Sequence, residues 1–194
     1  MKAETGRNGG FLAGVVASNE QARAISRISG KISLVALNAM LAARRGGAPG
    51  FRTVAGQLRE LSERLDGEMG LMAGQVALAV YDSAARMKRS RRVALMAAAN
   101  GEERLEKVLE RNRRVLSESA RESEARRLRL LERIRSASRL GDFGIALARN
   151  ARIEAVHGGE MATALYQVGL DIEQSMQDIL DSLARIESEI GNWS

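Results

Sequence analysis

The chain has 194 residues and a formal net charge of +6, and 45% of its residues are hydrophobic although only 3% are aromatic. This length suits one domain of ordinary size, and the lack of cysteine excludes disulfide bonds and thiolate metal sites. Ala, Leu, Arg and Glu dominate the composition, which favours long helices and coiled coils over a sheet protein.

Residues 1–10, MKAETGRNGG, form a polar start that we predict to be a flexible N-terminus. They lack the pattern of a signal peptide. No uninterrupted apolar run in the sequence is long enough to cross a bilayer. The sequence therefore predicts a cytoplasmic protein with no membrane span.

Two apolar seams predict a first helical hairpin over residues 11–99. From Phe11 to Arg45, and again after Pro49-Gly50, apolar residues recur at alternating spacings of three and four, the pattern of a packed helix face. The Gly-rich break between the seams predicts a folded-back tip near residues 46–50. The seam residues are Ile25, Ile28, Ile32, Val35 and Ala39 in the first helix, and Val54, Leu58, Leu61, Leu65, Met72, Val76 and Val80 in the second.

The rest of the chain predicts a second hairpin over residues 102–192. Asn100-Gly101 indicates a helix stop, because glycine tolerates the left-handed cap conformation. Glu102 and Glu103 then suit the positive end of a new helix, which runs towards Val156. Gly158-Gly159 interrupts it, and a fourth helix carries an apolar seam of Val168, Ile172, Ser175, Ile179, Leu183, Ile186 and Ile190.

The two tips resemble each other in sequence. NAMLAARRGG (38–47) aligns without gaps on NARIEAVHGG (150–159), which indicates a duplicated hairpin. Chance similarity between two alanine-rich helices is the alternative. The predicted fold class is all-α: a long antiparallel four-helix coiled-coil bundle, made of two hairpins in one chain. Its tips, near 46–50 and 157–160, would lie at one end and Asn100-Gly101 at the other.

The basic charge is most conspicuous between Glu110 and Arg139, where arginines alternate with acidic residues. Glu110 and Arg114, like Glu122 and Arg126, have the i,i+4 order that supports a solvated helix. The aromatic residues that single-strand binders use for stacking are absent from this stretch. A solvated face is therefore the favoured interpretation, nucleic-acid binding is disfavoured, and a partner-binding surface remains the third alternative.

Few side chains are suited to covalent chemistry. His157 is the only histidine, and its position beside Gly158-Gly159 suits a helix C-terminal cap rather than the exposed mid-helix histidine of a phosphotransfer domain. Glu173 and Gln177 have the spacing to position a water molecule in a response-regulator phosphatase, although such pairs are common on solvated helices. The sequence predicts no catalytic residue, no cofactor and no metal site.

Three glycines in the second helix leave two interpretations open. Gly67, Gly70 and Gly74 each cost about 1 kcal/mol relative to alanine inside a helix. They indicate either a bending segment or close packing against small side chains.

Residues Ile28 to Leu65 carry a resemblance to a known family. This stretch resembles the cytoplasmic signalling hairpin of bacterial methyl-accepting chemotaxis receptors. The first copy matches the family tip at Leu34, Ala36, Leu37, Asn38, Ala39, Ala43, Arg45, Gly47, Gly50, Phe51, Val54, Ala55, Arg59, Leu61, Glu63 and Arg64. The second copy matches it at Leu147, Ala148, Asn150, Ala151, Ile153, Glu154, Ala155, Gly159 and Glu160.

The resemblance implies a non-enzymatic signalling or scaffold protein that binds partners through its tips. Those partners would be a chemotaxis histidine kinase, a coupling protein or a response regulator, and self-association through the bundle or the tip is a further expectation. A response-regulator phosphatase or a histidine phosphotransfer bundle is the alternative function. The predicted partner-binding residues are Leu41, Arg44, Arg45, Phe51, Ile153, Glu154, His157 and Glu160.

Overall fold

The computed structural model of the chain is built from long α-helices. It describes residues 2–45, 48–98 and 103–191, with side chains described for 14–45, 48–96 and 106–191. The helices are α1 (Lys2–Arg45), α2 (Pro49–Ala98), α3 (Glu103–Ala155) and α4 (Ala162–Gly191), and a short 3-10 helix, η1 (Gly159–Met161), precedes α4. These described residues contain no strand, so the all-α prediction is confirmed.

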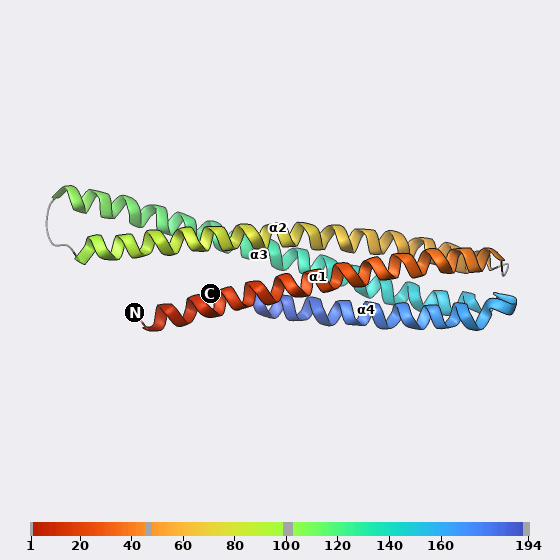
Figure 1. The fold of residues 1–194 in the computed structure, drawn as a ribbon. Helices are drawn as coiled ribbons and strands as arrows, with labels where there is room; N and C mark the ends of the chain where they lie inside the picture. The colour runs from red at the N-terminus through yellow and green to blue at the C-terminus, as the bar shows by residue number, and fades with distance from the viewer. Residues whose placement is uncertain (1, 46–47, 99–102, 192–194) are drawn as a thin grey trace.

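The four helices lie side by side as a helical bundle, and consecutive helices run in opposite directions (Figure 1). Helix α1 packs against α2 and α4, and α3 packs against the same two helices. The end of α1 and the start of α2 lie at the same end of the molecule as the end of α3 and the start of α4, whereas the end of α2 and the start of α3 lie at the opposite end (Figure 1).

Most helix boundaries lie close to the predicted ones, and α1 shows the largest difference. It begins at Lys2 instead of Phe11, although this stretch contains three glycines, which disfavour helix. The predicted flexibility of residues 1–10 stays a prediction. The predicted turn residues Gly46, Gly47, Asn100 and Gly101 lie outside the described residues, as does the predicted end of the second hairpin at 192.

The core follows the predicted seams closely in α2 and α4. Leu58, Leu61, Leu65, Met72 and Val76 of α2 are buried, as are Ile172, Ile179, Leu183, Ile186 and Ile190 of α4. In α1 the buried positions near the tip are Ala36, Ala39 and Ala43, whose small side chains allow a close helix approach. Ile25 and Ile32 of the α1 seam are also buried. The other predicted seam residues are half-buried: Ile28, Val35, Val54, Val80, Val168 and Ser175.

Glycines permit close approach between α3 and its neighbours. A Cβ atom added to Gly144 of α3 would lie 2.6 Å from the Met176 sulfur of α4, and one on Gly141 would lie 2.7 Å from Leu180. By contrast, a Cβ atom on Gly67, Gly70 or Gly74 would meet nothing within 4 Å. Close packing therefore does not explain those three glycines of α2. A bending segment in this part of α2 stays a prediction.

Polar contacts link neighbouring helices around the core. The buried Ser62 hydroxyl of α2 donates a hydrogen bond to the Ser29 carbonyl of α1. Arg133 of α3 pairs with Glu68 of α2 at 3.1 Å, and Arg135 on the same helix pairs with Glu187 of α4 at 3.1 Å. Helix α3 is thus tied by ion pairs to both of its neighbours.

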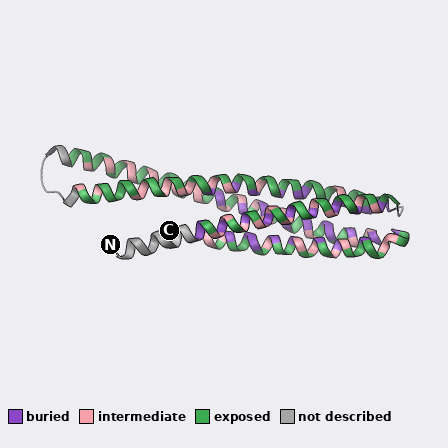
Figure 2. Ribbon diagram, in the orientation of Figure 1, coloured by how far each residue is buried: buried purple, intermediate pink, exposed green. Residues whose placement is uncertain are grey.

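Helices α2 and α3 extend beyond the ends of α1 and α4 as a two-helix arm (Figure 1). We define the arm as residues 81–98 of α2 and 103–129 of α3. None of its described side chains is buried, whereas buried residues run along the rest of the bundle (Figure 2). Glu110 and Arg114 form the predicted ion pair at 2.6 Å. The pairing of Glu122 with Arg126 that the i,i+4 spacing suggested is wrong. Arg126 pairs instead with Asp82 of α2, at 2.5 Å.

One helical stretch among the described residues, Gly14–Arg45 of α1, is long and apolar enough to cross a membrane by length and composition alone. Charged residues, among them Arg23, Arg27 and Lys31, interrupt the apolar run, and the absence of a membrane span stays a prediction. A helix that packs in a protein core meets the same criterion, and α1 does pack against α2 and α4.

Candidate functional site

The first tip presents the end of α1. Arg44 and Arg45 are exposed in the last turn, where positive charge suits the negative end of the helix dipole. Leu41 is 55% exposed, and Leu34 and Leu37 continue the same outer face toward the middle of the helix. The backbone N–H of Ala48 donates to the Ala43 carbonyl at 2.9 Å, a bond that closes the end of α1 before α2 begins.

The second tip is a tight turn after α3. The N–H groups of His157 and Gly158 donate to the carbonyls of Glu154 and Ala155, which tightens the last turn of the helix. Gly159 has a φ angle of 53°, a left-handed conformation that favours glycine. His157 and Glu160 are exposed on either side of the glycine pair.

Glu154 of the second tip lies against the first turn of α2 at the first tip. Its carboxylate lies directly against Gly50 in the first turn of α2, where a Cβ atom would overlap its oxygen. The positive end of α2 is a favourable place for a carboxylate. Glycine at position 50 therefore has a packing reason, and Glu154 contacts a helix from the other hairpin.

One predicted partner-binding residue is misplaced. Phe51 is 0% exposed and belongs to the core beneath the tip, so it cannot be part of a surface that a partner reaches. Its match to the tip of the resembled family led to the prediction, but its position in the first turn of α2 faces the other helices. Its role is to hold the start of α2 against the bundle.

The structure adds residues that the sequence did not single out. An open groove beside the second tip is lined by Ile153, Val156 and Tyr166, with the arginines at 149 and 152 along its edge. Ile153 is 65% exposed and Val156 is 72% exposed. Val156 aligns with Arg44 in the repeat, which is a signal that could have identified it.

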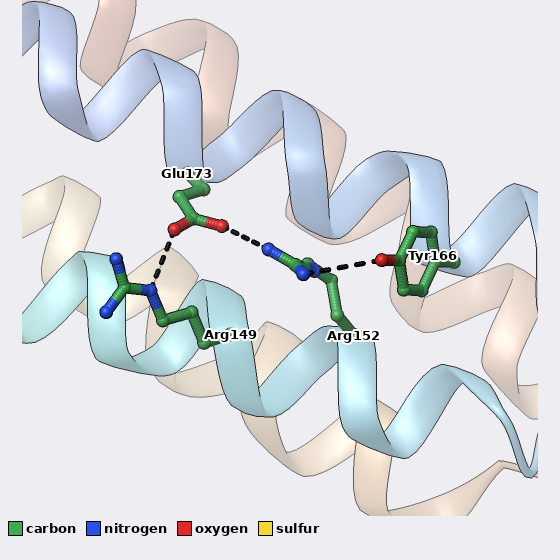
Figure 3. A network of polar contacts seen from close by, with 4 residues as sticks. All are labelled: Arg149, Arg152, Tyr166 and Glu173. Carbon is green, nitrogen blue, oxygen red and sulfur yellow. Dashed lines mark hydrogen bonds and ion pairs between the residues drawn. The ribbon is translucent and has the colours of Figure 1, made fainter.

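A polar network fixes the edge of this groove (Figure 3). Arg149 donates to one carboxylate oxygen of Glu173 at 2.8 Å, and Arg152 donates to the other at 2.5 Å. Arg152 also donates to the Tyr166 hydroxyl at 3.3 Å, with its guanidinium 5.2 Å from the centre of the ring. Both α3 arginines are therefore held in place by residues of α4.

The same contacts shift the protonation of the network. Hydrogen bonds from Arg149 and then Arg152 lower the pKa of the Glu173 carboxyl, against the opposing effect of partial desolvation. The hydrogen bond to Glu173 raises the pKa of Arg152. The Glu173 carboxylate and the Arg152 guanidinium therefore both carry their charges near neutral pH.

A Glu173→Gln variant should reveal this network in the pH dependence of stability. Because the pKa of Glu173 is lowered in the folded state, its stabilising contribution is present above the unfolded value near 4.5 and is lost as pH falls below it. We expect the variant to melt below the wild-type chain at pH 7 and level with it near pH 3. Thermal melts by circular dichroism at both values measure this.

Glu189→Gln is the matched control, since that carboxylate forms no ion pair among the described residues. Its melting temperature should differ little from wild type at either pH. A Glu173→Gln deficit that persists unchanged at pH 3 would contradict an ionic contribution.

Side chains arranged for catalysis are few in the described part of the chain. It contains no group of three or more His, Asp or Glu residues that could hold a metal ion. Both oxygens of Glu173 accept arginine hydrogen bonds, and Gln177 donates to Asp181 at 3.3 Å, so the two are engaged with different partners. His157 lies in a turn and not in the middle of a helix.

Comparison with models of known protein families and with curated proteins finds no match to this chain. The fold and the tips define its class: an all-helical bundle with two adjoining hairpin tips at one end and a two-helix arm at the other.

Proposed function

We propose that this chain is a non-enzymatic signalling or scaffold protein of chemoreceptor type. In this proposal the bundle is a long antiparallel four-helix coiled coil made of two chemoreceptor-like hairpins, and it acts in the cytoplasm. Its partners are a chemotaxis histidine kinase, a coupling protein or a response regulator, bound at the tips.

The observation that supports this proposal best is the pairing of the two tips at one end. Exposed apolar side chains stand beside charges on both tips, Leu41 next to Arg44 and Arg45, and Ile153 next to Glu154. Small patches of this kind often dominate binding, because a few apolar and arginine side chains carry most of the energy. The contact between Glu154 and Gly50 supports a single surface that includes both hairpins.

The enzymatic alternative has less support. A phosphotransfer histidine needs an exposed mid-helix position, and His157 is in the turn after α3. A phosphatase needs a carboxylate free to orient water, and both oxygens of Glu173 accept hydrogen bonds from arginine.

We expect Glu154→Lys and Arg45→Glu each to weaken partner binding at least tenfold, about 1.4 kcal/mol. Each reverses a charge at the tip, and Glu154→Lys also removes the carboxylate from the positive end of α2. Isothermal titration of each variant against the kinase, the coupling protein and the response regulator measures the loss, with circular dichroism to check folding.

Glu118→Lys in the arm is the control, because it reverses an exposed charge far from the tips. Its partner affinity should equal that of the wild-type chain. Sensitivity at Glu118 with none at Glu154 would refute a tip-directed partner. Loss of phosphate from a phosphorylated response regulator on mixing would instead favour the phosphatase.

A further inference from the structure

The positive charge of the molecule is concentrated in the arm. Residues 81–98 and 103–129 contain 14 of the 30 Lys and Arg residues but only 7 of the 24 Asp and Glu residues, a net charge of +7. The rest of the chain has 16 basic and 17 acidic residues, so its net charge is −1. The whole excess charge of the protein therefore lies on the part that projects from the bundle (Figure 1).

The end of α2 contributes cations without acidic neighbours. Lys88, Arg89, Arg91 and Arg92 are exposed, and none forms an ion pair among the described residues. The one acidic residue on this part of α2, Asp82, forms an ion pair with Arg126 of α3. Lys88 and Arg92 are four residues apart, so they lie on one face of the helix.

Antiparallel pairing places cations of α3 beside this cluster. Asp82 of α2 meets Arg126 of α3, so residues further along α2 lie next to residues earlier in α3. That part of α3 presents Arg111, Arg113 and Arg121, which are exposed and form no ion pair with any described residue. We call these seven side chains the arm cations: Lys88, Arg89, Arg91, Arg92, Arg111, Arg113 and Arg121.

We propose that the arm cations bind the phosphate backbone of double-stranded nucleic acid, without reading its sequence. The arm segment of α2 is about 27 Å long at 1.5 Å per residue. Over such a length a DNA duplex presents about 16 phosphate charges, one per 1.7 Å. Cations on exposed helix faces suffice for backbone contacts, because these depend on charge and not on the base edges.

The arm fits a duplex better than other polyanionic partners. Single-strand binders stack bases on aromatic side chains, and Tyr81 is the only aromatic residue in 81–129. A membrane-surface helix needs an apolar face separate from its cations, but Leu95, 66% exposed, shares its face with Lys88 and Arg92. A second arm carries the same net charge and would be repelled.

The sequence disfavoured nucleic-acid binding because the two segments that supply the arm cations are separate in the chain. The stretch from Glu110 to Arg139 mixes acids with its arginines, and several of these pair locally, as Glu110 does with Arg114. The cluster at 88–92 lies outside that stretch. Only the folded arm brings the two segments together.

The test uses the full chain and a labelled 30-base-pair DNA duplex in fluorescence anisotropy titrations. If about four arm cations contact phosphates, the association constant should fall about 100-fold between 50 and 200 mM salt. Changing Lys88, Arg89, Arg91 and Arg92 together to glutamine should weaken binding at least tenfold and flatten the salt dependence. Glutamine is a good helix former, and circular dichroism checks that the helix content is kept.

The matched control replaces four exposed cations of the bundle body, Arg23, Arg27, Lys31 and Arg185, with glutamine. It removes the same charge, and its duplex affinity should fall less than threefold. Equal weakening by both variants would overturn an arm-specific site. Absence of duplex binding by the wild-type chain at 50 mM salt would overturn the proposal, as would preference for phosphatidylserine vesicles over the duplex.

Discussion

A Leu61→Asp variant is expected to lose its helical structure far below the melting temperature of the wild-type chain. Leu61 is 3% exposed, and its Cδ2 atom lies 2.9 Å from where a Cβ on Gly144 of α3 would be. Removal of a buried leucine side chain alone costs about 2–5 kcal/mol. Burying an unpaired carboxylate costs more, and domains of this kind are stable by only about 5–15 kcal/mol. Thermal melting followed by circular dichroism measures the loss.

Arg113→Asp provides the comparison for this prediction. Arg113 is exposed on the arm and forms no ion pair among the described residues, so its replacement should change the free energy of unfolding by less than about 0.5 kcal/mol. Equal melting temperatures for the two variants would show that the Leu61 face of α2 is not in the core.

The parts of the fold that depend on local pattern could be predicted from the sequence. The spacing of Leu58, Leu61 and Leu65 identified a buried helix face, because three-and-four periodicity follows directly from helix geometry. The Gly-rich break indicated where α1 ends and the next helix follows, and α2 begins within the predicted tip at Pro49, since proline at a first helical position loses no hydrogen bond. These signals need no knowledge of which helices pack together.

Features that depend on which helices meet could not be predicted. The pairing of Arg126 with Asp82 joins residues far apart in the chain, whereas local spacing suggested Glu122. Likewise, glycine in a helix has the same sequence signal whether its face is packed, as at Gly144, or open, as at Gly70. The overhang itself follows from helix length, since α3 has 53 residues and α4 has 30, but which residues of α2 and α3 pair in the arm depends on contacts that local pattern does not show.

The candidate site could be predicted only where it depends on local pattern and not on contacts between helices. Helix ends and Gly-Gly breaks identified the tips, and Leu41 and Ile153 are exposed there. Burial of Phe51 and the network of Arg149, Arg152 and Glu173 depend on contacts between helices, which local pattern does not show.

The tips and the arm lie at opposite ends of the molecule, so they can act as two independent binding surfaces. Tip variants should therefore leave duplex binding unchanged, and arm variants should leave partner binding unchanged.

A Gly144→Val variant is expected to destabilise the bundle by about 1–3 kcal/mol through overpacking. A Cβ atom at this position would lie 2.6 Å from the Met176 sulfur and 2.9 Å from Leu61 Cδ2, closer than real Cβ atoms approach other side chains. Valine adds two further methyl groups in the same space. For a chain of this size each kcal/mol lowers the melting temperature by about 2–4 °C.

A second substitution tests whether the clash itself is responsible. Met176→Ala alone should cost about 2–5 kcal/mol because it leaves a cavity in the core. In the double variant the valine methyls occupy that cavity, so the combined loss should fall short of the sum by about 0.5–3 kcal/mol. Gly70→Val is the control, because a Cβ there meets nothing within 4 Å and valine has the higher helix propensity. If Gly70→Val destabilises the chain as much as Gly144→Val does, or if the double variant is simply additive, the contact of α3 with Met176 is not as described.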